Sequence, residues 1–453
     1  MQTFELIVIG AGSGLNISSA AAEKGMKVAI VEKGPMGGTC LNRGCIPSKI
    51  IIHSADAAEI IRKSELFGIS SKINSINFKK ITARASGIVA KDARKIEAGI
   101  KEDKNTTLFK TEAKFIAERT LKAGSEIIKG DKVIIAAGTR PSVPQIEGLK
   151  DVNFITSDEA LRLKKQPKTL TILGGGYIAA ELAHFFGALG TKISIVQRGK
   201  FLIPNEDWEV SKKFTEIFGK KYNILTEFQA KKASKRNNKF IVEAEGKNKK
   251  KKLVSDQLLV ATGRTPNTDL LDVRKANVEV DEKGFVKTNE YMETTAKNTW
   301  AFGDIAGKFL FKHSANLEAG YVYNNAILNK RIKVDYTAMP HAIFSSPQVA
   351  GVGLREQDLK EKRIDYAKGR YNYINSGMGI ALQDNDGFVK IFADRKTRKI
   401  LGCHILGADA STLIHEVIVA MKSSLTVDAI SEAVHVHPAL SEVVQRAVNN
   451  IEW

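Results

Sequence analysis

The segment Leu6–Gly14, LIVIGAGSG, places an apolar run directly before a glycine-rich turn near the start of the chain. A helix-like stretch follows to Lys24, and a second apolar run ends at Val31, just before Glu32. Glycines in such a turn permit close approach of backbone N–H groups to a pyrophosphate, and the N-terminus of the next helix favours negative charge. This pattern predicts a βαβ unit that binds a dinucleotide.

A second segment repeats the same order of features. Leu170–Ala179, LTILGGGYIA, precedes a helix-like stretch to Leu189 and an apolar run that ends at Gln197. In both segments a polar residue ends the second strand about 22 residues after the turn, which is the spacing expected of a dinucleotide fold. Two such units in one chain predict two dinucleotide-binding domains.

Three further strands and a change of pattern complete the predicted organisation. Val133–Pro141, VIIAAGTRP, resembles Leu258–Pro266, LLVATGRTP, and each is expected where the chain leaves a nucleotide domain. Thr299–Asp304, TWAFGD, is a strand that delivers an acid at its C-terminal end. From Thr337 onward, strands with polar turns precede two expected helices, at 410–423 and 427–432. The predicted fold class is α/β, with two Rossmann-like domains and a C-terminal α+β domain.

Length and composition exclude several classes of protein. The chain has 453 residues, 43% apolar and 26% charged, enough for two to four domains with their own cores. No stretch approaches the ~18 apolar residues of a membrane span, and the first strand begins too early to leave room for a signal peptide. Three cysteines are too few for a secreted disulfide scaffold. We therefore expect a cytoplasmic protein.

The net charge of +19 is concentrated in one part of the chain. Residues 212–252 contain fourteen Lys or Arg and four Glu, and the densest run, Lys247–Lys252, separates two strand-like runs. We interpret this run as a solvated hairpin tip rather than as a nucleic-acid-binding or membrane-binding surface.

Two of the three cysteines lie within Gly37–Lys49, GGTCLNRGCIPSK. Five residues on a regular helix rise ~7.5 Å, beyond the ~7 Å Cα separation that a disulfide tolerates. A bridge between Cys40 and Cys45 therefore requires an irregular helix, which Pro47 favours because it removes a backbone hydrogen bond to Arg43. Such a pair would be redox-active rather than structural. Two unrelated buried thiols are the alternative, and zinc is disfavoured because no second Cys/His pair has ligand spacing.

These segments, together with His435–Glu442, HVHPALSE, occur in an order that resembles the class I pyridine nucleotide–disulfide oxidoreductases over essentially the whole chain. That family includes dihydrolipoamide dehydrogenase, mycothione reductase, glutathione reductase and mercuric reductase. The resemblance implies a homodimer that passes two electrons between NAD(P)H and a small disulfide or dithiol, through FAD and the cysteine pair. It divides the chain into an FAD-binding domain (1–150, continued at 268–337), an NAD(P)-binding domain (151–267) and a dimerisation domain (338–453).

The resemblance also assigns roles to single residues. Cys40 is the exposed thiol that attacks the substrate, and Cys45 faces the flavin. Lys49 pairs with Glu181 beside the flavin, and Tyr177 gates the nicotinamide pocket. The expected cofactor-binding residues are Gly10, Gly12, Gly14, Glu32, Lys33, Gly38, Thr39, Lys49, Gly138, Gly174, Gly176, Tyr177, Ile178, Gln197, Arg198, Gly263 and Asp304.

The C-terminal motif supplies the expected acid/base. The resemblance implies that His437, held by Glu442, reaches in from the second subunit to exchange a proton with the substrate sulfur. No metal site is expected. Cys403 is interpreted as a buried thiol, and His313 as a residue that lies near the flavin or only on the surface. Four other histidines are interpreted as surface or core residues: His53, His184, His341 and His415.

Departures from the family pattern bear on the choice of nicotinamide and substrate. Dihydrolipoamide dehydrogenases carry an acid at the position of Gln197, whereas here Arg198 and Lys200 follow, which favours the 2′-phosphate of NADPH. The segments FKHSAN (311–316) and IAAELAH (178–184) are more similar to mycothione reductase. The alternatives are a metal-ion or quinone reductase of the same fold, and a component of an acyltransferase complex whose flavin is mainly structural. No nucleic-acid or membrane partner is expected.

Overall fold

The computed structural model describes residues 1–453, and its N-terminal unit is built on a seven-stranded sheet. The central strands β1 and β2 are apolar and buried over Leu6–Ile9 and Val28–Val31, as expected of parallel strands covered on both faces. The order is β3-β2-β1-β6-β5-β4, with β16 paired in parallel to β6. The strands are β1 (Gln2–Ile9), β2 (Val28–Val31), β3 (Thr106–Phe109), β4 (Ala113–Ala117), β5 (Thr120–Ala123), β6 (Glu126–Ile135) and β16 (Thr299–Ala301).

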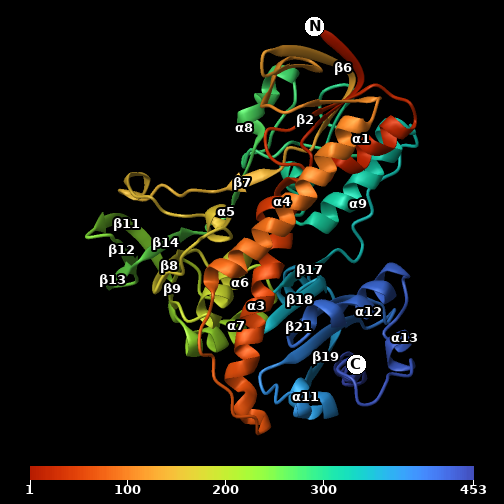
Figure 1. Ribbon diagram of the computed structural model, residues 1–453. Coiled ribbons are helices and arrows are strands. Elements are labelled where there is room, and N and C mark those ends of the chain that lie inside the picture. Colours follow the sequence, from red (N-terminus) through yellow and green to blue (C-terminus); the bar gives the residue numbers. More distant parts are fainter.

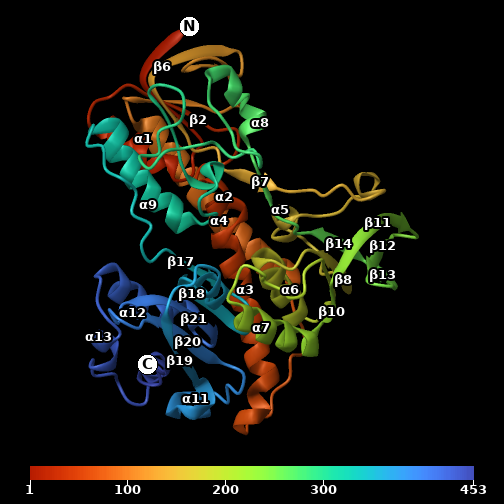
Figure 2. The same cartoon turned by 180° about the vertical axis from the view of Figure 1, so that it is seen from behind.

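Helices cover this sheet and connect it to the rest of the molecule. α1 lies against α9, although about 300 residues separate them in the chain (Figure 2). The long pair α3 and α4 runs from this unit down the middle of the molecule, where α3 packs against α6 (Figure 1). The helices are α1 (Gly14–Glu23), α2 (Gly38–Arg43), α3 (Cys45–Lys63), α4 (Phe78–Glu102), α8 (Thr268–Leu271) and α9 (Lys312–Val322), with short helical turns at Ser64–Phe67, Val273–Ala276, Gly303–Ala306 and Tyr323–Ile327.

A second nucleotide-type unit has a four-stranded parallel sheet of order β10-β9-β8-β14. An antiparallel sheet β11-β12-β13 lies at its periphery, and the short pair β7-β15 joins the unit to the first one (Figures 1 and 2). Its elements are α5 (Ser157–Ala160), β8 (Thr169–Leu173), α6 (Tyr177–Ala188), β9 (Lys192–Gln197), α7 (Trp208–Lys221), β10 (Asn223–Thr226), β11 (Phe228–Arg236), β12 (Lys239–Gly246), β13 (Lys249–Ser255) and β14 (Gln257–Val260), with β7 (Thr139–Pro141), β15 (Arg264–Pro266) and a helical turn at Leu149–Asp151.

The sequence analysis placed the whole lysine run Lys247–Lys252 in a hairpin tip, but most of the run belongs to a strand. Gly246 pairs with Lys249, so the turn consists of Lys247 and Asn248 alone, and Asn248 has the positive φ of 57° that a tight hairpin requires. The lysines that follow belong to β13 and are exposed along it. Two of these lysines lie opposite glutamates of β12: Lys252 is opposite Glu243, and Lys250 is opposite Glu245. The Lys250 ammonium pairs with the Glu245 carboxylate at 2.9 Å.

The C-terminal unit is a five-stranded antiparallel sheet of order β17-β18-β21-β20-β19. α12 and α14 pack on one face, whereas α6 and α7 of the second unit approach the other. The two helices predicted at 410–423 and 427–432 are observed as α12 and α13, which end at Lys422 and Ser431. The helix α14, which begins a few residues after Pro438, was not predicted. The elements are β17 (Pro340–Ile343), β18 (Gln348–Gly353), α10 (Glu356–Glu361), β19 (Tyr366–Asn372), α11 (Gly377–Ala381), β20 (Phe388–Asp394), β21 (Ile400–Gly407), α12 (Ala410–Lys422), α13 (Asp428–Ser431) and α14 (Glu442–Asn449), with a helical turn at Tyr373–Asn375.

The observed architecture confirms the predicted fold class of two nucleotide-type units and an α+β unit. No helix is both long enough and apolar enough to cross a membrane.

Candidate active site

The first glycine turn forms a cradle that only glycine backbone permits. Gly10 has a φ of 104°, and a Cβ there would lie 2.3 Å from the carbonyl oxygen of Ala136. A Cβ on Gly38 would lie 2.7 Å from the Cα of Gly12, so the turn and the cysteine segment pass in close contact. The N-terminus of α1 opens onto this turn, and no side chain caps it. These features fit the pyrophosphate of FAD.

Glu32 stands at the C-terminal end of β2, where the dinucleotide fold positions a ribose-binding acid. Its carboxylate accepts hydrogen bonds from the backbone N–H groups of Ala11 (2.9 Å) and Gly34 (2.7 Å). The two bonds hold the carboxylate beside the glycine turn. Lys33, by contrast, is exposed and pairs with Glu112 at 3.1 Å.

Asp304 follows β16 and lies at the start of a helical turn. The hydroxyl of Thr139 donates to its carboxylate at 2.9 Å, and Arg264 lies 3.9 Å away. Burial raises the pKa of the Asp304 carboxyl, and the Thr139 hydrogen bond and the Arg264 charge oppose that shift. Thr139 lies in β7 and Arg264 in β15, so the pairing of these two strands brings both residues to Asp304.

The cysteine pair lies across a break between two helices. Cys40 is in α2 and Cys45 is the first residue of α3, because Gly44 between them has non-helical dihedrals of −139° and −121°. A Cβ on Gly44 would approach the carbonyl oxygen of Thr39 to 3.0 Å and the Cα of Cys40 to 3.3 Å. Gly44 therefore lets the two cysteines approach each other, whereas the sequence analysis attributed the irregularity to Pro47.

The pKa values of the two thiols are shifted in opposite directions. A hydrogen bond from Cys40 and the nearby Lys49 ammonium lower the pKa of Cys45 to about 7, although partial burial opposes this. The same hydrogen bond, together with burial, raises the pKa of Cys40. Of the two residues Cys45 is the more exposed and Cys40 is half-buried, whereas the resemblance makes Cys40 the exposed thiol. The pair therefore shares one proton, which resides on Cys40 when Cys45 is a thiolate.

Lys49 and Glu181 come together from α3 and α6. The Lys49 ammonium donates to both Glu181 carboxylate oxygens, at 2.7 and 2.9 Å. Glu181 also accepts from the backbone N–H of Phe344 at 3.1 Å. Lys49 lies one helical turn beyond Cys45, so this ion pair keeps a positive charge beside the more acidic thiol.

The second glycine turn repeats the first. Gly174 has a φ of 101°, and a Cβ there would lie 2.3 Å from the carbonyl oxygen of Ala261. Gln197 is buried, and its side-chain amide donates to the backbone carbonyl of Phe201 at 3.2 Å, whereas Arg198 is exposed. Of the other glycines assigned to nucleotide binding, Gly138 and Gly263 have positive φ at the ends of the strands that lead to β7 and β15, and Gly176 precedes α6.

Tyr177 begins α6 in an aromatic cluster. Its ring stacks near Phe311 and His341, with centroid distances of 6.0 and 6.2 Å, and its hydroxyl donates to Glu206. Burial, followed by the Glu206 charge, raises the pKa of the Tyr177 phenol. The adjacent Ile178 packs against the core around α3 and α6.

His437 is paired with a carboxylate of its own chain in the C-terminal unit. The Glu442 carboxylate accepts from His437 Nδ1 at 3.1 Å and from the backbone N–H of Ala439 at 3.2 Å. The His437 side chain is 75% exposed. α2 lies in the N-terminal unit, whereas the C-terminus lies at the opposite end of the molecule (Figure 2).

Lys312 is a site residue that the sequence analysis did not single out, although it lies in the segment that resembles mycothione reductase. Its ammonium donates to the Ser13 hydroxyl in the first glycine turn at 2.8 Å. Burial lowers the pKa of Lys312, and charge on Cys40 and Cys45 opposes that shift. The α9 N-terminus therefore adds a cation between the glycine turn and the cysteine pair.

Comparison with known proteins agrees with this geometry. The profile of the pyridine nucleotide-disulphide oxidoreductases matches residues 4–340, and that of their dimerisation domain matches residues 339–448. The chain is 34% identical to mycothione reductase of Mycobacterium tuberculosis, with 99% of each chain aligned. It is 32% identical to dihydrolipoyl dehydrogenase of Bacillus subtilis, with 98% of this chain and 95% of the relative aligned.

A solved structure is also similar to this chain over nearly the full length of both. It is the Cu(II) complex of the HOCl-induced flavoprotein disulfide reductase RclA from Escherichia coli, with a TM-score of 0.89, 26% identity and 99% of each chain covered. With family profiles matching both the nucleotide-binding and the dimerisation regions, the chain belongs to the pyridine nucleotide-disulphide oxidoreductase family and is an oxidoreductase that uses FAD and NAD(P)H.

Proposed function

We propose that this protein is an NAD(P)H:disulfide oxidoreductase that transfers electrons through FAD and the Cys40–Cys45 pair to a small disulfide, as in mycothione reductase or dihydrolipoamide dehydrogenase. The observation that carries the proposal is the acidity of Cys45, whose thiol pKa is lowered to about 7 beside a protonated Cys40. A pair that holds one thiolate near neutral pH suits thiol–disulfide exchange. When bound, FAD supplies the two-electron connection between the nicotinamide and this pair.

The raised pKa of Cys40 explains why the exchange needs a base. Cys40 Sγ attacks one sulfur of the substrate disulfide, the S–S bond breaks, and the leaving sulfur receives a proton. Cys45 Sγ, as a thiolate, then attacks Cys40 Sγ, which breaks the mixed disulfide, releases the second substrate sulfur as a thiolate and forms the Cys40–Cys45 disulfide. In our proposal His437 of the partner subunit, oriented by its carboxylate, removes the Cys40 proton and donates it to the leaving sulfur.

Several finer assignments belong to the same proposal. The FAD-binding part comprises 1–150 and 268–337, the NAD(P)-binding part 151–267 and the dimerisation part 338–453. NADPH is the preferred nicotinamide, because Arg198 and Lys200 are exposed beside the strand end where Gln197 offers no carboxylate. The protein acts in the cytoplasm as a homodimer with two equivalent sites.

Steady-state kinetics of the FAD-loaded protein tests the proposal. We expect NAD(P)H-dependent reduction of at least one of lipoamide, glutathione disulfide and mycothiol disulfide, and loss of that activity in Cys40→Ser and Cys45→Ser. Cys403→Ser, which changes a fully buried thiol, is the matched control and should retain turnover. Reduction of mercuric ion or a quinone that survives Cys40→Ser, with no disulfide reduced by the parent protein, would contradict the proposal.

A further inference from the structure

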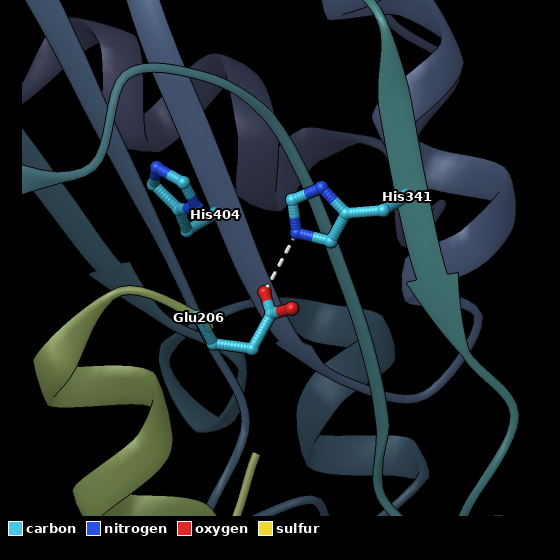
Figure 3. Close-up of side chains that lie close together, drawn as sticks. All are labelled: Glu206, His341 and His404. Atoms are coloured by element: carbon cyan, nitrogen blue, oxygen red, sulfur yellow. Dashed lines mark hydrogen bonds and ion pairs between the residues drawn. The ribbon is translucent and has the colours of Figure 1, made fainter. Parts of the chain in front are cut away.

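A polar cluster at the junction of the second and C-terminal units takes no part in the proposed electron transfer. It consists of Glu206, which lies just before α7, and of His341 and His404 in the C-terminal sheet. One potential ligand atom from each residue lies within 4.8 Å of the others. Figure 3 shows the two imidazoles and the carboxylate converging from separate elements.

Strand register brings the two imidazoles together. His341 in β17 pairs with Gly351 in β18, and Gly351 pairs with His404 in β21. Residues directly opposite each other in a sheet point to the same face. Gly351 has no side chain, and a Cβ there would lie 2.6 Å from His341 Nε2 and 2.9 Å from His404 Nδ1. The two ring nitrogens therefore face one space that glycine leaves open.

His404 presents a lone pair to this space and has nothing to receive it. Its Nε2 bonds to the backbone carbonyl of Leu354 at 3.0 Å, so Nε2 carries the proton, since a carbonyl only accepts. Nδ1 is therefore an acceptor, and it is fully buried without a hydrogen-bond partner. A backbone carbonyl that orients the second ring nitrogen is typical of metal-bound histidines.

Glu206 supplies a buried negative charge without a lysine or arginine partner. Its side chain is fully buried, one oxygen accepts from Tyr177, and the other accepts from His341 Nε2 at 2.7 Å. A metal ion bound at this Nε2 would displace its proton to solvent, as metal binding to histidine generally does. The buried ammonium of Lys390 contacts the adjacent Asp207 and is shared with two glutamates, Glu209 and Glu356. A buried carboxylate without a cation is costly, and a metal ion is one way to compensate it.

From this arrangement we infer that His341 Nε2, His404 Nδ1 and the Glu206 carboxylate form a binding site for a divalent transition-metal ion of the Zn²⁺ class. Two imidazoles and one carboxylate are a ligand set that zinc accepts, with water completing the coordination. Ligand atoms around tetrahedral zinc lie about 3.3 Å apart, so the site must contract slightly. The His341 side chain is 17% exposed, so the cluster can be reached from solvent on that side.

The site would join two units of the chain. Glu206 belongs to the segment between β9 and α7, whereas both histidines belong to the C-terminal sheet. The hydrogen bond that Tyr177 donates to Glu206 orients the carboxylate, as such bonds do in known metal sites. Metal binding should therefore stabilise the contact between these units.

Equilibrium dialysis against Zn²⁺ tests this inference on the FAD-loaded dimer. The background carries Cys40→Ser and Cys45→Ser, so that the redox thiols bind no zinc. We expect one zinc per chain, and an affinity at least about 100-fold weaker in His341→Gln and Glu206→Gln. His53→Gln changes an exposed histidine outside the cluster and should retain the zinc.

The variant Gly351→Ala distinguishes a metal-binding site from a cluster that is only hydrogen-bonded. It keeps all three ligands but fills the space between them, so zinc affinity should also fall at least about tenfold. Zinc should raise the melting temperature of the background protein and leave that of His341→Gln unchanged. The inference is wrong if the background protein binds no zinc, or if His341→Gln binds it as tightly as His53→Gln.

Discussion

Replacing Cys40 with alanine should raise the pKa of the Cys45 thiol from about 7 to near its ordinary value of 9.0. The hydrogen bond from Cys40 is the largest cause of the lowered pKa, and alanine removes it. The Lys49 ammonium remains, but partial burial opposes it. A shift of two pKa units corresponds to about 2.7 kcal/mol of lost thiolate stabilisation. Cys40→Ser is the matched control, because a hydroxyl in the same place still donates a hydrogen bond.

The rate of alkylation by iodoacetamide as a function of pH measures this shift. In both variants Cys45 is the reactive thiol, because Cys403 is fully buried. At pH 7 the thiolate fraction falls about 50-fold when the pKa rises from 7 to 9. A more basic thiolate is more nucleophilic, which offsets the loss about six- to tenfold. We therefore expect alkylation at pH 7 to slow about five- to eightfold, and the midpoint of the pH profile to move by up to two units.

The midpoint is the decisive quantity, because it does not depend on intrinsic nucleophilicity. If Cys40→Ala and Cys40→Ser titrate with the same midpoint, the Cys40 hydrogen bond does not control the acidity of Cys45. The proposed division of roles within the pair would then lose its physical basis.

Three further predictions address the partner subunit, the nicotinamide and the domain junction. His437→Gln should slow disulfide turnover about 10²–10⁴-fold, the usual value of acid–base assistance, while flavin reduction by NAD(P)H persists in stopped-flow traces. Mixed dimers of His437→Gln and Cys40→Ser chains should regain activity, and full activity in a verified monomer would exclude a shared site. Arg198→Ala should weaken NADPH binding by ~1.5–3 kcal/mol with little effect on NADH, as measured by KM; an equal loss for both would argue against a 2′-phosphate contact. Lys390→Met leaves three carboxylates without their buried ammonium and should cost ~3–5 kcal/mol in urea unfolding at pH 7. Lys390 helps to hold the pKa of Glu356 at about 2, below its ordinary value, so this stabilisation is present above the unfolded pKa and is lost as the pH falls towards 2. The destabilisation should therefore shrink on acidification, and a loss independent of pH would contradict the ion-pair explanation.

Local sequence was sufficient for the nucleotide-type units. The apolar runs before Gly10 and Gly174 are buried parallel strands, and both glycines adopt the positive φ that the turns require. These features depend on residues close together in the chain, so hydrophobic pattern and backbone sterics predict them. The same holds for the irregular cysteine segment, although the residue responsible is Gly44 rather than Pro47.

Side-chain environment was much less predictable. Lys312 reaches the first glycine turn from a helix about 300 residues away, and no spacing in the sequence indicates that contact. Likewise, the extent of β13 through the lysine run depends on cross-strand pairing with β12, not on the propensity of lysine for loops.

The sequence by itself predicted the close cysteine pair and the irregular helix around it, because the thiols lie five residues apart and their geometry depends on one local helix break. Only the tertiary structure decided the cluster of His341, His404 and Glu206. The two histidines are 63 residues apart and become neighbours through the register of three strands over Gly351. Glu206 meets them because a separate unit packs on that face of the sheet. Strand register and the packing of units depend on long-range contacts, which leave no fixed spacing in the sequence.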